Sequence, residues 1–188
     1  MTRAALIAFA IAVMPAAPGV AQSVAPSATT ATYGNWTVTC GMAAVVGTAT
    51  PQKLCQMTTK LNLKGNDGQL RPLLEVAIGL PPGGTVPRIV LQVPIDVTLR
   101  APVVVSVDAE AAGEPKPQTD LVTATYFACT PAGCIADAEL TTTASVALMD
   151  AKITNVTFTA LTGTKKITVP VEMTGYVDAW NALGMPVP

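Results

Sequence analysis

Four cysteines, Cys40, Cys55, Cys129 and Cys134, are the side chains in this sequence best suited to covalent chemistry. In an exported chain an even number of cysteines indicates disulfides, and four cysteines allow three pairings. Cysteines on strands adjacent in the sequence reach the distances that a disulfide requires with the least rearrangement of the backbone. We therefore favour the pairs Cys40–Cys55 and Cys129–Cys134, which predict a secreted, cross-linked domain.

A zinc site made from all four cysteines is the main alternative. Fourteen residues separate the first two cysteines and four separate the last two, whereas zinc knuckles use about two to four at both ends. A redox role is also disfavoured, because Cys129 and Cys134 do not form a Cys-x-x-Cys pair and no basic residue lies nearby to activate a thiolate. We expect no metal site and no cofactor.

The sequence contains no histidine. A chain without histidine cannot form a Ser-His-Asp triad, a Cys-His pair, a zinc-protease helix or a histidine metal ligand. Most common hydrolase and metalloenzyme mechanisms are therefore closed to this chain acting alone. We predict that it is not an enzyme and assign no catalytic residue.

Asp137 and Glu139 are the pair of carboxylates that most resembles catalytic machinery. They lie two residues apart in a predicted strand and so share one face, as the acid and base of a small hydrolase would. No rim of aromatic residues that could hold a sugar accompanies them, so we favour a solvated strand face. The hydrolase alternative predicts a cleft around the two carboxylates.

Trp36 and Trp180 are the only tryptophans. Trp36 alternates with polar residues and is expected in the core. Trp180 lies with Tyr176 on a predicted C-terminal helix, where the pair either packs the helix against the sheets or forms an exposed patch for a partner. Trp180 and Tyr176 are therefore the candidate partner-binding residues.

Residues 1–21 have the plan of a secretory signal peptide. Arg3 precedes an apolar run from Ala4 to Met14, and small residues end at Ala21. The run is shorter than the roughly 20 residues that span a bilayer, so we predict no transmembrane segment in the mature chain; a retained N-terminal anchor is the alternative. Residues 22–32, rich in Ser, Ala, Thr and Pro, are expected to form a flexible N-terminus.

Charge and composition limit the remaining function classes. Removing the leader takes away one of the 11 basic residues, which leaves 10 against 12 acidic residues, a net charge of −2. Because there is no basic field, we expect no nucleic-acid partner. The chain is 50% hydrophobic but only 4% aromatic, so its core is expected to consist of small and β-branched side chains, which favour sheet.

Apolar and polar residues alternate in short runs that predict strands. The expected strands are 33–40, 54–61, 70–80, 88–93, 103–107, 121–127, 134–140, 156–161 and 167–173, with a short piece at 94–102. The turn at 130–133 brings Cys129 and Cys134 within bridging reach. Two helices are expected, at 141–151 with Thr142 or Thr143 as its cap and at 176–183 before Gly184. About ten strands separated by turns predict an all-β sandwich over residues 33–184, with 185–188 as a tail.

Several motifs together resemble the invasion-associated locus B (IalB) family of bacterial envelope proteins. They are Tyr33-Gly34-x-Trp36-x-Val38-x-Cys40, the following Cys55, Cys129-x-Pro131-x-Gly133-Cys134-Ile135-Ala136, and the ending Val169-Pro170-Val171 to Gly175-Tyr176. The resemblance implies an immunoglobulin-like β-sandwich that is exported to the periplasm or outer envelope of a Gram-negative bacterium. It carries over no catalytic residues.

The leading functional hypothesis is a non-enzymatic binding module whose sheet edges or terminal helix dock on another envelope or periplasmic protein. The alternative is an accessory or structural subunit of a multi-subunit periplasmic or inner-membrane enzyme complex, which would explain exposed apolar residues. Two less favoured hypotheses complete the set. The family name suggests a host-cell invasion factor, and the Asp137–Glu139 pair suggests a small hydrolase that uses carboxylates.

Overall fold

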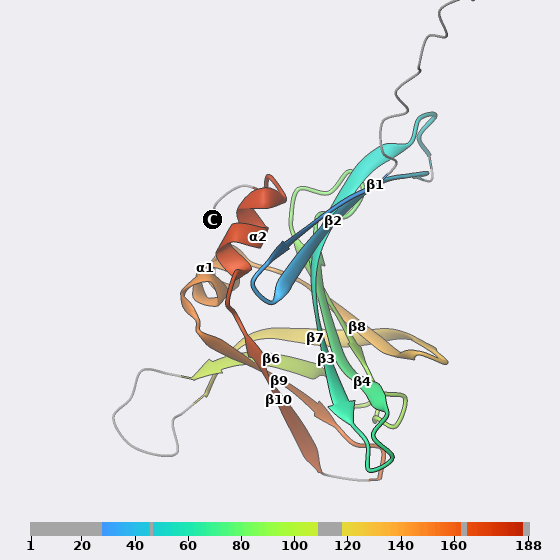
Figure 1. Ribbon diagram of the computed structural model, residues 1–188, viewed down its shortest axis with the longest axis vertical. Coiled ribbons are helices and arrows are strands. Elements are labelled where there is room, and N and C mark those ends of the chain that lie inside the picture. The colour runs from blue at the N-terminus through green and yellow to red at the C-terminus, as the bar shows by residue number, and fades with distance from the viewer. Residues whose placement is uncertain (1–27, 46, 109–117, 163–164, 186–188) are drawn as a thin grey trace, which may run out of the picture.

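The computed structural model describes residues 28–45, 47–108, 118–162 and 165–185 (Figure 1). The expected signal peptide lies outside these residues. Within them the chain forms ten strands and two helices: β1 (Ala28–Tyr33), β2 (Trp36–Ala43), β3 (Gln52–Lys64), β4 (Leu70–Gly79), β5 (Arg88–Val93), β6 (Val103–Asp108), β7 (Gln118–Thr130), β8 (Gly133–Glu139), α1 (Thr142–Asp150), β9 (Ile153–Thr159), β10 (Lys166–Glu172) and α2 (Tyr176–Ala182).

Neighbouring strands pair antiparallel in the order β1-β2-β3-β4-β5-β8-β7-β6-β9-β10. The long strand β7 pairs with β6 through its first half and with β8 through its second half. It therefore passes from one layer of the fold to the other, and Figure 1 shows β7 crossing between β6 and β8. The all-β fold with two short helices near the C-terminus, predicted from the sequence, is confirmed.

The core lies between the two layers and is made mainly of aliphatic side chains. Every second residue of a strand points inward, which buries Val76 and Ile78 of β4, Val105 of β6, and Val156 and Phe158 of β9 in one continuous cluster. Burying each such side chain stabilises the fold by roughly 1.5–3 kcal/mol. The cluster thus holds the layers together with few aromatic residues.

The cap of helix α1 lies one residue before the first of the two expected caps. The hydroxyl of Thr141 accepts a hydrogen bond from the backbone N–H of Ala144 at 3.2 Å, so Thr141 is the cap and not Thr142 or Thr143. Thr141 has the extended conformation that a capping residue requires. The helix buries Leu148, whereas Val146 is exposed.

The expectation of a flexible segment over residues 22–32 is wrong for its last five residues. Residues 28–32 belong to β1, which pairs with β2 from Ala28 to Tyr33. Their side chains are exposed, so backbone hydrogen bonds to β2 define this strand and burial does not. The short piece at 94–102 forms only an isolated bridge between Val97 and Ala160.

Two glycines allow the turn between β1 and β2 to pack against the turn that precedes α2. Gly34, in the turn between β1 and β2, and Gly175, before α2, both have positive φ. The backbone N–H of Asn35 donates to the carbonyl of Thr174 at 3.0 Å, and a Cβ added to Gly175 would overlap the carbonyl of Tyr33. The turn that starts α2 therefore packs backbone against backbone on the β1–β2 turn.

Neither of the two helices in the described part is long and apolar enough to cross a membrane.

We expect Gly175→Ala to destabilise the protein by about 3 kcal/mol, because a left-handed conformation and a backbone overlap are both penalised. Gly68→Ala is the matched control: Gly68 also has positive φ, but an added Cβ there meets no atom within 4 Å, so the loss should be about 1 kcal/mol. Equilibrium denaturation with urea measures both. Equal losses in the two variants would contradict the close packing of the two turns.

Candidate functional site

A groove of about 450 Å³ crosses the outer face of β2, β3, β4, β5 and β8. Its floor is made of residues that alternate with the buried ones, among them Thr39 and Gly41 of β2 and Ala77 and Gly79 of β4. Because these side chains are small or absent, the floor lies low between its neighbours. Met42, which is 57% exposed, and Leu80 and the prolines that follow it add larger apolar walls.

The groove ends at a cluster of charges on β5 and β8. Arg88 Nε donates to Asp137 Oδ2 at 2.9 Å, and Arg88 Nη2 also contacts this oxygen; Arg88 Nη1 donates to Glu139 Oε1 at 3.3 Å. Arg88 and Glu139 are directly opposite each other in the sheet, so the cluster is a set of cross-strand pairs. The sequence interpretation missed Arg88, since only strand pairing places it beside the carboxylates.

This geometry argues against the carboxylate hydrolase. Asp137 and Glu139 do share one face, as predicted, but both are held by the same guanidinium. Charge-assisted hydrogen bonds fix Asp137 Oδ2 and Glu139 Oε1 on the Arg88 guanidinium. The cluster therefore orders the end of the groove.

The two outer edges of the sheet differ in their protection. β10 carries Lys166, Pro170 and Glu172, and charges and proline are devices that prevent another strand from pairing. β1, with the sequence Ala-Thr-Thr-Ala-Thr-Tyr, has no charge and no proline, and its register with β2 shows no shift. Ala28 and Thr30 of β1 lie opposite Gly41 and Thr39, so the unprotected edge flanks the groove on its outer face.

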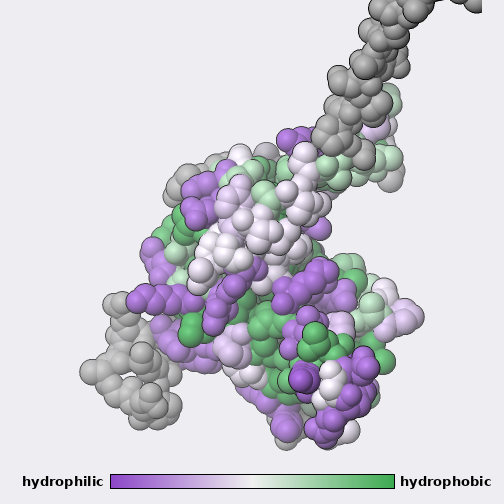
Figure 2. Space-filling model, viewed as in Figure 1, coloured by the Kyte–Doolittle hydropathy of each residue, from purple (hydrophilic) through white to green (hydrophobic). Residues whose placement is uncertain are grey.

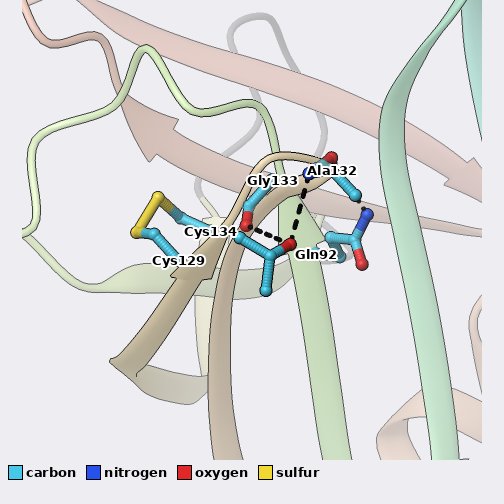
Figure 3. Close-up of a disulfide and its surroundings, with 6 residues drawn as sticks. Gln92, Cys129, Ala132, Gly133 and Cys134 are labelled. Atoms are coloured by element: carbon cyan, nitrogen blue, oxygen red, sulfur yellow. Dashed lines mark hydrogen bonds between the residues drawn. A yellow bond between two sulfur atoms is a disulfide. The ribbon is translucent and has the colours of Figure 1, made fainter.

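Both cysteine pairs favoured from the sequence form disulfides, and the described residues include no free cysteine. Cys40 and Cys55 lie opposite each other on β2 and β3. Cys129 and Cys134 close the β7–β8 hairpin, shown in Figure 3. In the turn, Thr130 Oγ1 accepts from the N–H of Ala132 at 3.2 Å, and Gln92 of β5 donates to the carbonyl of Ala132 at 3.2 Å. The hairpin is thus attached to the strand that carries Arg88.

Of the two alternatives for Trp180 and Tyr176, the structure shows packing of the helix against the sheet, and the exposed patch for a partner is not formed. Trp36, Tyr176 and Trp180 are each 1% exposed, and the rings of Trp36 and Tyr176 meet edge to face with centroids 5.1 Å apart. The Gly175 turn folds α2 back onto β2, so the aromatic side of the helix faces inward. Burial raises the pKa of the Tyr176 phenol above its ordinary range. Among the described residues, the large aromatic side chain that is exposed is Phe127 of β7, which the strand pattern did not distinguish.

In the part of the chain that the structure describes, no three His, Cys, Asp or Glu side chains lie close enough together to hold a metal ion.

A family model for the invasion associated locus B (IalB) protein matches residues 36–184. The chain belongs to this family. The IalB match spans the groove, both disulfides, α1 and α2.

A solved structure of an IalB-type protein is also similar. The crystal structure of invasion associated protein B from Bartonella henselae matches with a TM-score of 0.62 and 25% sequence identity, over 82% of this chain and 94% of that chain. No curated protein matches. The comparisons thus establish the IalB family and fold.

We expect removal of the Cys40–Cys55 disulfide to destabilise the protein more than removal of Cys129–Cys134. The pairs are separated by 15 and 5 residues, and on the chain-entropy estimate loops of these lengths contribute about 3 and about 2 kcal/mol. Equilibrium denaturation of the double variants Cys40→Ala/Cys55→Ala and Cys129→Ala/Cys134→Ala measures the two losses. The opposite order would show that the short hairpin matters beyond chain entropy.

Proposed function

We propose that this IalB-family chain is an exported envelope protein that acts as a non-enzymatic protein-binding module. The observation that carries the proposal is the apolar groove beside the unprotected β1 edge. The secretory plan of residues 1–21 and the family's association with the bacterial envelope support export.

The groove fits a polypeptide better than a small metabolite. It is open and mainly apolar, and the charged residues that line it, Arg88 and Asp137, are already paired with each other. Small-molecule sites usually enclose their ligand and direct several polar groups at it. Protein-binding surfaces instead combine apolar area with exposed backbone groups, and the β1 edge lies beside this groove.

We propose that the partner is an extended segment of another envelope protein that adds to β1 as a strand. Backbone hydrogen bonds to an edge strand supply affinity in such complexes, and alternate side chains supply specificity. The added strand would place every second side chain on the outer face that carries the groove. At the far end, two carboxylates share one guanidinium, so the residual charge of −1 favours a segment without acidic residues there.

The accessory-subunit alternative rests on a different surface. Leu63, Leu70 and Leu161 are each about 60% exposed or more, and they lie at or next to the ends of β3, β4 and β9. Figure 2 shows hydrophobic surface in the lower part of the molecule, interrupted by hydrophilic side chains. Contiguous exposed apolar area often marks a contact with another protein. A stable subunit of an enzyme complex would cover this end.

Thr30→Lys tests the proposed docking. A charged side chain on the β1 edge should disfavour strand addition and reduce the amount of partner recovered by affinity purification from native envelopes about tenfold, which corresponds to about 1.4 kcal/mol. Thr168→Lys on the protected β10 edge is the matched control and should leave recovery unchanged. Equal denaturation midpoints would show that both variants fold.

Three outcomes of this experiment separate the alternatives. Full recovery of the partner by Thr30→Lys would exclude the β1 edge. Recovery of a stoichiometric enzyme complex that is lost in Leu70→Lys but retained in Thr30→Lys would support the accessory-subunit function. Recovery of the wild type as a free monomer without any partner would count against both.

A further inference from the structure

Three connections between strands lie at the same end of the fold. The antiparallel register of β4 and β5 places the start of β4 at the end where β5 finishes. The backbone N–H of Leu161, just after β9, donates to the carbonyl of Asp96, just after β5, at 2.9 Å. The two hairpins concerned, β3–β4 and β9–β10, have this end at the bottom of Figure 1. We call it the hairpin end; it comprises residues 63–71, 94–102, 160–162 and 165–166.

Large apolar side chains gather in exposed positions at the hairpin end. Among the described residues, seven large apolar side chains are more than half exposed, and five of the seven belong to this end. Single exposed apolar residues need no explanation, but a group of them marks a surface that contacts something else. The five are Leu63, Leu70, Ile95, Leu99 and Leu161.

The hairpin end also carries an excess of positive charge. Five basic residues and two acidic residues, Asp67 and Asp96, give it a charge of +3. The whole chain has a formal net charge of −1, so the rest of it sums to −4. Asp67 pairs with Arg71 at 2.8 Å, and the other four basic residues form no ion pair with a described carboxylate. The basic residues, all exposed, are Lys64, Arg71, Arg100, Lys165 and Lys166.

We propose that the hairpin end docks on a membrane surface rich in anionic phospholipid. Clusters of about four to eight Lys and Arg residues near a bilayer attract anionic headgroups. Apolar side chains among them enter the boundary between the headgroups and the acyl chains, while the long stems of lysine and arginine keep the charged groups in the headgroup layer. The hairpin end supplies both kinds of side chain on adjacent connections.

A protein partner fits the hairpin end less well. Lysine is depleted at protein–protein interfaces relative to the rest of the surface, and a protein that covered this end would bury several cations that have no partner. An anionic bilayer brings a negative headgroup to each cation. Apolar and basic residues also follow each other directly at three places, which a mixed apolar and charged boundary suits: Leu63-Lys64, Leu70-Arg71 and Leu99-Arg100.

Docking in this way leaves the groove and the β1 edge accessible. On β3, Leu54 lines the groove, whereas Leu63 belongs to the hairpin end. Nine residues of strand separate them by roughly 30 Å. The groove would therefore face away from the membrane, so this inference goes beyond the proposed docking of a partner strand and does not depend on it.

Flotation with lipid vesicles tests the charged part of the surface. We expect the mature protein to bind vesicles of phosphatidylcholine mixed with phosphatidylglycerol, more weakly as salt screens the charges, and not to bind vesicles of phosphatidylcholine alone. Lys165→Gln/Lys166→Gln should lower the affinity about 25-fold, about fivefold for each cation lost. The control Lys53→Gln/Lys152→Gln removes the same charge near the starts of β3 and β9, away from the hairpin end, and should bind like the wild type.

The apolar part is tested by Leu63→Ser/Leu161→Ser. This variant should lower the affinity about tenfold, because less apolar surface enters the bilayer. The control Val146→Ser/Val177→Ser changes exposed residues of the two helices and should bind like the wild type. Equal denaturation midpoints show that the variants fold.

Three results would overturn the proposal: no binding by the wild type, equal binding to both kinds of vesicle, or undiminished binding by both hairpin-end variants. If the wild type does not bind vesicles and Leu63→Ser/Leu161→Ser loses an enzyme complex from native envelopes, the hairpin end contacts a protein instead. Thr30→Lys should bind vesicles like the wild type, so failure of the partner docking and failure of the membrane docking are told apart.

Discussion

The packing of α2 on β2 is the interaction on which the other features depend. The Gly175 turn brings Tyr176 against Trp36, and Trp180 continues the buried aromatic cluster. β2 is therefore held from its inner side by the last helix of the fold. The same strand carries Cys40, forms one wall of the outer groove and supplies the hydrogen bonds that order β1. Three of the few aromatic residues in this chain, Trp36, Tyr176 and Trp180, thus lie where β2 meets α2.

The strands and the cysteine pairs were accessible from the sequence because local rules govern them. Period-two alternation marks a half-buried strand wherever it occurs, and the turn at 130–133 sets the geometry between Cys129 and Cys134. What the sequence did not predict depends on tertiary contacts. β1 is ordered by a neighbouring backbone, Arg88 meets its carboxylates only across a strand pair, and the direction in which Trp180 points is decided by a turn that precedes its helix. The candidate site was therefore predicted less well than the fold.

Membership of the IalB family explains the architecture and leaves the partner open, since one fold can carry many functions. The interior is built from residues that any two-layered sheet requires. The distinguishing features are on the surface: a groove floored by small residues, a cluster of charges at one end, and one edge that lacks the protection found at the other. Of these, the contrast between the edges is the most specific, because natural sheets usually guard against pairing with other chains.

The path of β7 has a mechanical consequence. Its thirteen residues belong to both layers, because hydrogen bonds tie its first half to β6 and its second half to β8. On the β7 side the layers therefore cannot separate without breaking a continuous strand. Tension applied to β6 is therefore transmitted along the backbone of β7 to β8 in the opposite layer, so that a pull on one layer loads both.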